Sequence, residues 1–245
     1  MTNISFVVPA FNEERLLAGT LRAIREAASS LDESAEVILV DDASTDATEA
    51  VAHAHGARVV SVNCRQIAAS RNAGARAARG QWLIFVDADT IVTKEVVQAA
   101  VAALRSQAVG GGCNVRFDGR LPLYARALIA AALPLYQALG LAAGCFVFCT
   151  REAFDAVGGF DQTLFAAEEV VLSRALGRRG RFVILREHVY TSGRKLRAYS
   201  AREVLGALLR LALNGRRAMG RREGLEIWYG ERRKDPGSEA SERSE

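Results

Sequence analysis

The stretch Gln81-Trp82-Leu83-Ile84-Phe85-Val86-Asp87-Ala88-Asp89-Thr90 decides how the rest of the chain is interpreted. Its first half is a continuous apolar run, rich in aromatic and β-branched residues, which is typical of a strand buried on both faces. The run ends in Asp87 and Asp89, which point to the same side of an extended chain. Paired carboxylates at the end of a buried strand suit a divalent cation, although an ordinary turn that closes the strand explains them as well.

The composition indicates a globular protein with basic regions. Of the 245 residues, 50% are hydrophobic and 24% are charged, and the formal net charge is +4. The arginines are concentrated between residues 178 and 233, a distribution that suits phosphates or an anionic membrane surface. The chain has no helix-turn-helix spacing, zinc-ligand pattern or interleaved stacking aromatics, so we expect no nucleic-acid partner.

The cysteines and the N-terminus indicate the compartment. Cys64, Cys113, Cys145 and Cys149 lack the spacing of a metal site, so we expect free, buried thiols. The chain enters an expected strand at residues 4–8 without the features of a signal peptide. We therefore expect a cytoplasmic protein, with the inner face of the cytoplasmic membrane as an alternative location.

Residues 127–149 contain no charged residue and are long enough to span a bilayer. Pro134, Gln137, Gly140 and Gly144 interrupt this run. The interruptions favour an alanine-rich helix followed by a short strand at residues 145–149, with a membrane span as the alternative.

The first ninety residues alternate between expected strands and helices. The strands are expected at residues 4–8, 36–40, 58–62 and 82–86. This alternation predicts an α/β fold with a parallel sheet, in which ligands bind beyond the carboxyl ends of the strands. Acidic residues follow three of these strands, and glycine-rich phosphate loops are absent from the sequence. Such an acidic site needs a metal ion to bind a phosphorylated ligand.

Four motifs occur in a fixed order along this region. They are Val7-Val8-Pro9-Ala10-Phe11-Asn12-Glu13-Glu14, Val40-Asp41-Asp42-Ala43-Ser44-Thr45-Asp46, Ala69-Ser70-Arg71-Asn72-Ala73-Gly74 and Val86-Asp87-Ala88-Asp89. Together with residues 151–161 and 167–169, they resemble family 2 glycosyltransferases of the GT-A fold. The resemblance covers residues 1 to about 190. It implies a Rossmann-like, mostly parallel central sheet with helices on both faces, and an inverting transfer of sugar from a nucleotide-sugar donor.

The resemblance also implies which residues bind the donor. The nucleotide would lie against Pro9, Ala10, Phe11 and Glu13, while Asp42 would read the uracil or ribose and Arg71 would reach the base or a phosphate. Asp89 would coordinate Mn²⁺ or Mg²⁺, and Asp87 would hold the ribose or a metal-bound water. Glu13 and Arg71 also have ordinary explanations, as a first-turn acid and a solvated helix residue.

An inverting transfer needs a base that accepts the proton of the acceptor hydroxyl. The family usually supplies an aspartate from a Glu-Asp pair that opens a helix, and the matching pair in this chain is Glu168-Glu169. The resemblance therefore implies Glu169 as the base, one methylene longer than usual, with Glu168 orienting it or binding the acceptor. Both residues could instead be plain helix-start acids.

Further residues complete the implied site. Gly144 and Cys145 would approach the donor sugar, and Gly159 would lie in a turn beside the acceptor. The resemblance implies His188 as a candidate metal ligand, although a single histidine is more often structural. Arg194 and Lys195 would clamp the diphosphate, or form a mobile basic loop.

The sequence after the motifs divides into three parts. We expect a GT-A domain at residues 1–195, a basic amphipathic extension at 196–230 with a helix at 201–222, and a disordered charged tail at 231–245. Acceptor specificity should lie in residues 116–144, where a helix that is apolar nearly all round starts near Leu121. Such a helix must be buried in a core, a partner or a membrane interface, which leaves the role of segment 121–143 open.

The leading hypothesis is an inverting, metal-dependent glycosyltransferase that uses a nucleotide sugar, most simply a UDP-sugar, to build a cell-envelope glycan or glycolipid. A polyprenyl-phosphate glycosyltransferase with a lipid-linked acceptor and peripheral membrane contact is the alternative. A nucleotide-binding or membrane-docked scaffold that has lost its chemistry is a third hypothesis, supported only by Glu169 in place of the usual aspartate.

Overall fold

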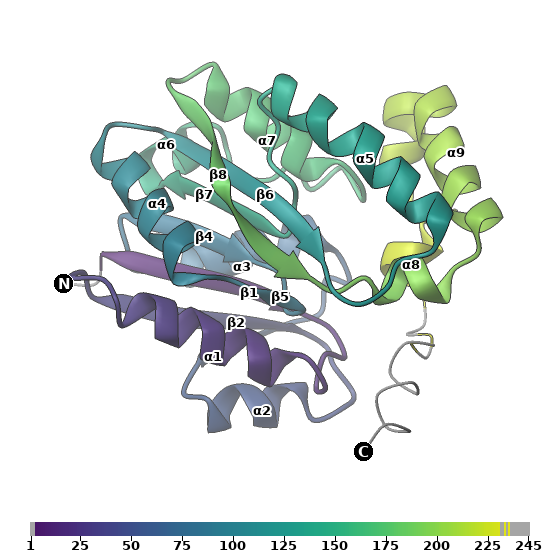
Figure 1. Ribbon diagram of the computed structural model, residues 1–245. Coiled ribbons are helices and arrows are strands. Elements are labelled where there is room, and N and C mark those ends of the chain that lie inside the picture. The colour runs from purple at the N-terminus through teal and green to yellow at the C-terminus, as the bar shows by residue number, and fades with distance from the viewer. Residues whose placement is uncertain (1–2, 231–232, 234, 236–245) are drawn as a thin grey trace.

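The computed structural model describes residues 3–230, 233 and 235, and within them it forms one eight-stranded mixed sheet covered by helices (Figure 1). The strand order is β3-β2-β1-β4-β7-β6-β8-β5. The strands are β1 (Ile4–Ala10), β2 (Ala35–Asp42), β3 (Arg58–Val62), β4 (Trp82–Val86), β5 (Thr90–Ile91), β6 (Gly110–Phe117), β7 (Phe146–Thr150) and β8 (Phe182–Thr191). The α/β fold expected from the sequence is confirmed.

The sheet has a parallel half and a mixed half. Strands β3, β2, β1 and β4 are mutually parallel, whereas β7 runs antiparallel to both β4 and β6. Beyond β7, β6 and β8 pair in parallel, and the short β5 pairs antiparallel with β8. The carboxyl ends of β1, β2 and β4 therefore meet at one edge, where the sequence places its acidic motifs.

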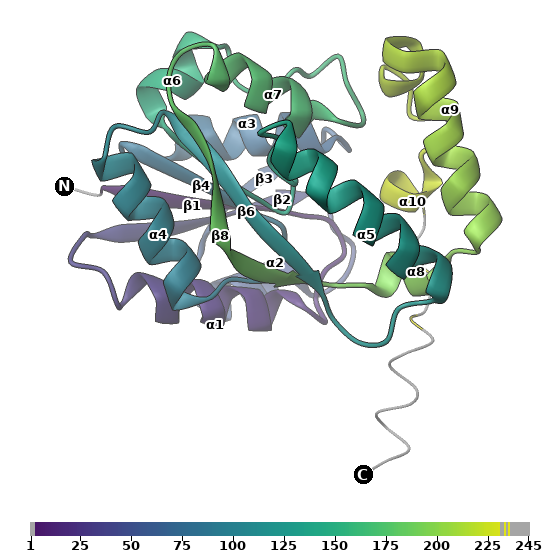
Figure 2. The same cartoon turned by 45° about the horizontal axis from the view of Figure 1, so that its top comes forward.

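Helices cover both faces of the sheet (Figures 1 and 2). One face packs against α1 (Leu17–Ala28), α2 (Thr48–Ala54) and α4 (Lys94–Arg105), and the other against α3 (Ile67–Ala77), α6 (Arg151–Ala156) and α7 (Glu168–Gly177). The remaining helices, α5 (Leu123–Ala138), α8 (Arg194–Ala198), α9 (Ala201–Met219) and α10 (Glu226–Tyr229), gather at one end of the molecule.

The central strands are buried because their side chains pack into the two core layers, one on each face of the sheet. In β4, Ile84 and Val86 belong to the core cluster under α1 and α4, while Leu83 and Phe85 belong to the cluster under α3 and α6. All four side chains are fully buried. Alternating directions along a strand require apolar residues at every position when both faces are covered, which explains the continuous apolar run.

Strand β6 and helix α4 were not expected from the sequence. Three consecutive glycines begin β6, and glycine normally weakens a strand. The reason for glycine is space: a Cβ at Gly111 would lie 2.2 Å from the Val183 carbonyl oxygen and 2.5 Å from the Phe148 ring. The glycines let β6 pass closely between β7 and β8.

Strand β8 is longer than the expected segment 181–185. It continues to Thr191 because its pairing with β6 resumes after a register shift between Cys113 and Asn114. His188 therefore lies inside the strand instead of in a loop after it.

The uncharged segment 127–149 forms most of α5 and then β7, as the interruptions predicted. Among the residues that the structure describes, no helix is both long and apolar enough to cross a bilayer. The four cysteines are free. Cys113 and Cys149 are buried as expected, Cys145 is half-buried, and the expectation of a buried thiol is wrong for Cys64, which is exposed.

The C-terminal extension folds back onto the domain. The expected helix 201–222 corresponds to α9, which is interrupted at Gly215, where the backbone has φ 49° and ψ −131°. After α9, α10 returns to the carboxyl edge of the sheet (Figure 2). The predicted disordered tail 231–245 falls outside the described residues apart from positions 233 and 235.

Candidate active site

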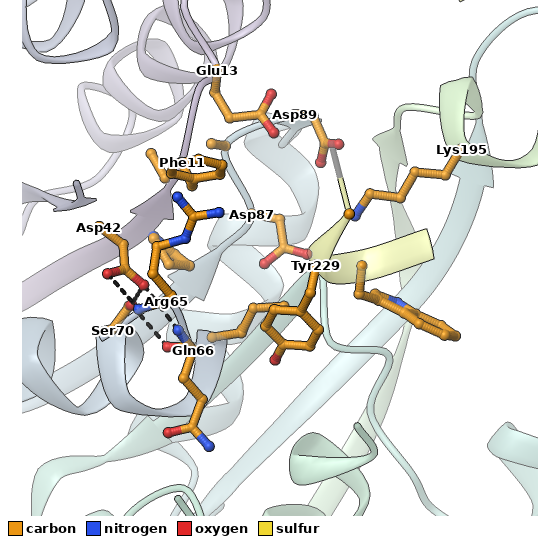
Figure 3. A pocket seen from close by; sticks show the side chains of 16 residues that line it. Phe11, Glu13, Asp42, Arg65, Gln66, Ser70, Asp87, Asp89, Lys195 and Tyr229 are labelled. Atoms are coloured by element: carbon orange, nitrogen blue, oxygen red, sulfur yellow. Dashed lines mark hydrogen bonds between the residues drawn. The ribbon is translucent and has the colours of Figure 1, made fainter. Parts of the chain in front are cut away.

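A pocket opens at the carboxyl ends of β1, β2 and β4 (Figure 3). Its space, including the open mouth, is about 680 Å³. Several sequence motifs converge there with α10. The lining residues are Pro9, Ala10, Phe11, Glu13, Asp42, Arg65, Gln66, Ile67, Ser70, Asp87, Ala88, Asp89, Lys195, Trp228, Tyr229 and Gly230. The structure thus brings together most of the residues that the resemblance implied for the donor nucleotide.

Hydrogen bonds join the loop that follows β1 to the loop that follows β2 at the edge of the pocket. The Asn12 backbone N–H donates to Ser44 Oγ at 3.0 Å, and the Thr45 N–H donates to Asn12 Oδ1 at 2.8 Å. The Glu13 N–H donates to Thr48 Oγ1 at 2.8 Å. These side chains hold the loop after β1 against the loop after β2, and so they set the position of Glu13.

Asp42 organises the loop between β3 and α3. Its Oδ1 accepts backbone N–H bonds from Cys64 and Arg65 at 2.7 and 2.8 Å, and its Oδ2 accepts bonds from the Gln66 N–H and the Ser70 hydroxyl at 3.0 and 2.8 Å. Four donors around one buried carboxylate form a rigid turn. Asp42 lines the pocket while shaping its wall.

The loop that Asp42 organises brings Arg65 over Phe11, with the guanidinium carbon 3.4 Å from the ring centroid. Arg65 has a left-handed backbone, with φ 49°. Within the described residues, four of the five non-glycine residues with positive φ lie in the loops around this region: Asn12, Ala43, Arg65 and Ala167. Such conformations cost about 1–2 kcal/mol each and concentrate at functional sites.

Arg71 is the central charge of the site. Its side chain is 2% exposed, and it donates to Glu168 Oε1 at 2.9 Å, Asp87 Oδ1 at 2.7 Å and the Gly144 carbonyl at 2.8 Å. Burial alone would lower the pKa of Arg71, but the charges of Asp87 and Glu168 outweigh burial and raise it. Arg71 therefore joins α3, the end of β4 and the start of α7, with its guanidinium engaged by protein acceptors.

Glu169 lies beside the ion pairs that Arg71 makes with Asp87 and Glu168. Its carboxyl carbon is 3.5 Å from the position that a Cβ on Gly144 would take, and Arg71 Nη2 is at the same distance from that position. Burial, and then the negative charge of Glu168, raise the pKa of Glu169 above its ordinary value. Helix α7 begins after the N-cap residue Ala167, which has φ 61°, and both glutamates lie in the first turn of the helix.

The glycines of the motif at residues 158–161 serve a turn that docks on α3. Gly159 has φ 74°, and a Cβ there would lie 2.7 Å from Asn72 Oδ1. Asn72 pairs with the backbone of Phe160 through two hydrogen bonds of 2.8 and 2.9 Å. Cys145 accepts the Asp87 N–H through its carbonyl at 3.2 Å, so the backbone before β7 also positions the Asp87 carboxylate.

Arg194, at the start of α8, connects two of the acidic residues. The Nη2 atom of Arg194 donates to Glu13 Oε1 and also to Asp89 Oδ2, the latter at 3.0 Å. Burial would lower the pKa of Arg194, but Glu13 and Asp89 raise it overall. Lys195 enters the pocket from the same helix, near Asp89 and opposite Asp42 (Figure 3). Together the two residues supply positive charge at the acidic end of the pocket.

The donor set at Asp87 and Asp89 fits a hard divalent cation only in part. Each aspartate keeps one oxygen that takes no hydrogen bond in the described part of the chain, Asp87 Oδ2 and Asp89 Oδ1. No group of three or more His, Cys, Asp or Glu residues there could hold a metal ion. Mg²⁺ commonly binds through one or two carboxylates together with substrate phosphates, so these two oxygens would hold the ion only together with the phosphates of a bound ligand.

His188 is not brought to these aspartates. It is absent from the pocket lining, and its Nε2 lies 3.0 Å from the Tyr190 hydroxyl, with the two rings in edge contact. The reason is that His188 belongs to strand β8, not to a loop that could reach the pocket.

Sequence reasoning missed part of the pocket wall. Arg65, Gln66 and Ser70 lie just before or within the third motif, and the four hydrogen bonds of Asp42 could not be anticipated from their spacing. Trp228 and Tyr229, in the basic extension expected at residues 196–230, also line the pocket. Their aromatic character was the only signal for this role.

Comparison with known proteins identifies the family. The family described as glycosyl transferase family 2 matches residues 5–158, which include all four ordered motifs. The chain belongs to this family.

Three relatives of known sequence match parts of the chain. The succinoglycan biosynthesis protein ExoO of Rhizobium meliloti is 34% identical over 126 residues, covering 48% of this chain and 35% of that protein. The validoxylamine A glucosyltransferase of Streptomyces hygroscopicus is 33% identical over 49% of this chain and 30% of its own. The undecaprenyl-phosphate 4-deoxy-4-formamido-L-arabinose transferase of Pseudomonas paraeruginosa is 39% identical over 35% of this chain and 27% of its own. The matches thus span about a third of each relative.

Solved structures share the fold. Staphylococcus aureus TarS 1-349 in complex with UDP-GlcNAc superposes with a TM-score of 0.61 at 20% identity, covering 86% of this chain and 65% of that one. The mannosyltransferase PcManGT of Pyrobaculum calidifontis, in complex with GDP-Man and Mn²⁺, gives a TM-score of 0.67 at 18% identity, covering 87% and 62%. The predicted GT-A fold is therefore confirmed.

Proposed function

We propose that this chain transfers a sugar from a nucleotide-sugar donor to a hydroxyl acceptor, with inversion at the anomeric carbon. The observation that carries the proposal is the placement of Asp87. This carboxylate lines the nucleotide pocket on one side and meets Arg71, the neighbour of Glu168 and Glu169, on the other. The donor pocket and the candidate base thus lie on either side of one buried ion-pair network.

The donor nucleotide lies in the pocket between Phe11 and the α10 residues Trp228 and Tyr229. Phe11, backed by the Arg65 guanidinium, offers an aromatic face for a base. The wall that Asp42 organises receives the base or ribose, and Asp87 receives ribose hydroxyls or metal-bound water. We favour UDP as the carrier because the TarS structure is a UDP-GlcNAc complex. The PcManGT structure holds GDP-Man instead, so the donor screen below includes GDP-sugars.

The diphosphate lies at the acidic end, next to Arg194 and Lys195. Asp89 and Asp87 hold Mn²⁺ or Mg²⁺ through their remaining oxygens, as the Mn²⁺ complex of PcManGT suggests for related folds. Bound there, the ion supplies Lewis-acid stabilisation to the leaving diphosphate. Lys195 adds a positive charge that needs no rearrangement, since it already points into the pocket.

Glu169 accepts the proton of the acceptor hydroxyl as that oxygen attacks the anomeric carbon. Its raised pKa makes it a better proton acceptor once it is ionised. Arg71 fixes Glu168 and the Gly144 carbonyl, and through them the position of Glu169. A Cβ at Gly144 would make ordinary contacts of 3.5 Å with both Arg71 Nη2 and the Glu169 carboxyl carbon, so Gly144 adjoins the candidate base.

The acceptor belongs to a cell-envelope glycan or glycolipid, as the succinoglycan relative suggests. A polyprenyl-phosphate acceptor is a second candidate, favoured by the undecaprenyl-phosphate relative and by the exposed apolar helix α5.

A donor screen tests the proposal. UDP-, GDP- and dTDP-sugars are incubated with the protein, with Mn²⁺ or with a chelator, and release of the nucleoside diphosphate is measured with and without a polyprenyl phosphate in detergent. We expect Mn²⁺-dependent release from a UDP-sugar. Binding without release under every condition would instead support a scaffold that has lost its chemistry.

A further inference from the structure

Helix α5 is an apolar helix with one half-buried face and one face exposed to solvent. Of its 16 residues, LYARALIAAALPLYQA, only Ala125 is buried, and Arg126 is the one charged residue. Leu123 is 78% exposed and Leu135 is 57% exposed, and Leu139, the C-cap residue after the helix, is 56% exposed. Monomeric proteins rarely leave a contiguous apolar ridge in water, so such a surface marks an interaction site.

Three arginines lie at one side of this helix. A broad groove between the end of β6 and α5 is lined by Arg116, Arg120 and Arg126, together with Phe117, Leu121 and Ile129. All three arginines are exposed. None of the three guanidinium groups has a hydrogen-bond or ion-pair partner among the described residues. By contrast, the buried Arg71 and the half-buried Arg194 are both paired with carboxylates.

Helix α9 adds a second apolar stripe at the same end of the molecule. Leu205, Leu209 and Leu213, spaced one turn apart, are 50%, 59% and 75% exposed, and the exposed Arg202 lies within the same arc of the helix. In both views α5 and α9 lie beside each other, next to α8 (Figures 1 and 2).

We propose that α5 docks on an anionic lipid surface, with Arg116, Arg120 and Arg126 binding lipid phosphates and the exposed leucines entering the acyl boundary. An apolar ridge beside cationic side chains is the pattern of a helix that lies in a membrane interface. The long apolar stems of arginine allow its head to reach phosphates while the helix sinks below them. The docking does not depend on glycosyl transfer, so its failure leaves the proposed function untouched.

Charge decides between the lipid surface and the other candidate occupant, a second copy of this chain. Two copies that met through α5 would bring six unpaired arginines together, which is unfavourable in the low dielectric of an interface. Acidic lipid headgroups supply the opposite charge at high density. Each arginine near such a surface contributes about a fivefold gain in binding, so the three together contribute roughly a hundredfold.

Vesicle co-sedimentation tests the docking with the full chain. The probes are vesicles of pure phosphatidylcholine and vesicles that also contain phosphatidylglycerol. We expect binding only to the acidic vesicles, lost on raising the salt concentration. The combined change Arg116→Gln, Arg120→Gln and Arg126→Gln should weaken binding roughly a hundredfold. Leu135→Gln with Leu139→Gln should also weaken it, with the charge unchanged.

The matched control changes Arg22, Arg178 and Arg179 to Gln, which removes the same charge from exposed positions on α1 and at the end of α7. It should retain nearly all of the binding. Far-UV circular dichroism and the melting temperature check that every variant is folded. Equal loss in the control, binding to phosphatidylcholine alone, or a concentration-dependent dimer disrupted by the leucine changes would each overturn the proposal. Competition by inorganic phosphate without any effect of the leucine changes would indicate a soluble-anion site and also overturn it.

Discussion

Arg71 Nη2 lies 2.7 Å from Asp87 Oδ1, and this contact joins the pocket at the carboxyl edge of the sheet to the acidic start of helix α7. Arg71 lies on helix α3 and Asp87 follows strand β4, and the two residues belong to two separate motifs of the sequence. Because Arg71 also binds Glu168, loss of its charge would leave two carboxylates without their compensating partner.

We expect Arg71→Ala to destabilise the protein by about 3–5 kcal/mol, because breaking a buried ion pair leaves uncompensated charge. Chemical denaturation measures the change in the free energy of unfolding. Arg76→Ala, at an exposed position on the same helix, is the control and should change stability by less than about 1 kcal/mol. Comparable losses of unfolding free energy in the two variants would contradict the role of Arg71 in compensating the charges of Asp87 and Glu168.

Asp42→Asn tests whether Asp42 acts by shaping the pocket wall. An asparagine amide nitrogen cannot accept the backbone N–H bonds that an Asp42 oxygen accepts, so the loop at Cys64–Gln66 should loosen. We expect a loss of about 1–3 kcal/mol in stability together with weaker UDP binding. Ser70→Ala removes only one of the four donors and should have a smaller effect on both measurements. Unchanged stability with lost binding would indicate direct base recognition instead.

Glu169→Gln should lower the transfer rate about a hundredfold or more while leaving UDP affinity within about twofold of the wild type. Single-turnover transfer and calorimetric binding separate the two effects. Glu152→Gln, which changes an exposed glutamate on α6, is the matched control and should transfer normally. Full transfer by Glu169→Gln would rule out Glu169 as the base.

The raised pKa of Glu169 predicts a pH dependence of stability. The folded state keeps the proton on Glu169 at pH values where the unfolded state has lost it. The contribution of this group is therefore present below the unfolded pKa and declines as the pH rises toward the folded pKa. Glu169→Gln should accordingly raise the melting temperature, by more at pH 8 than at pH 5. A larger gain at pH 5 would contradict the raised pKa.

Tyr229→Ala should weaken UDP binding about tenfold, because α10 supplies one wall of the pocket proposed to bind the nucleotide. Tyr190→Ala is the matched control, since Tyr190 is 40% exposed on β8 and does not line the pocket. Fluorescence or calorimetric titration with UDP measures both. Equal affinities in the two variants would exclude α10 from the nucleotide site.

The sequence predicted the sheet edge well because its signals there are local. The apolar run before Asp87 identifies a doubly buried strand, and the ordered motifs place acids at the ends of β1, β2 and β4. The identity of the partners of Arg71 was not predictable, since Glu168 is 97 residues away along the chain. Spacing alone cannot show which carboxylate a buried guanidinium will meet.

The misplaced His188 and the missed β6 share one physical cause. Both depend on pairing between β6 and β8, which lie far apart in sequence and whose pairing contains a register shift. Glycine at the start of β6 hides the strand from a propensity argument, and only the close approach of Val183 and Phe148 explains it. The role of α10 was missed for a similar reason, because Tyr229 reaches the pocket through chain reversal after α9.

The central claim is that Asp89 holds a divalent cation under the diphosphate of a nucleotide sugar. Calorimetric titration of UDP with and without Mn²⁺, into the wild type and Asp89→Asn, tests it most directly. We expect Mn²⁺ to increase the UDP affinity of the wild type at least about tenfold, or about 1.4 kcal/mol, and to have no such effect on Asp89→Asn. An equal Mn²⁺ effect in both proteins would contradict the claim.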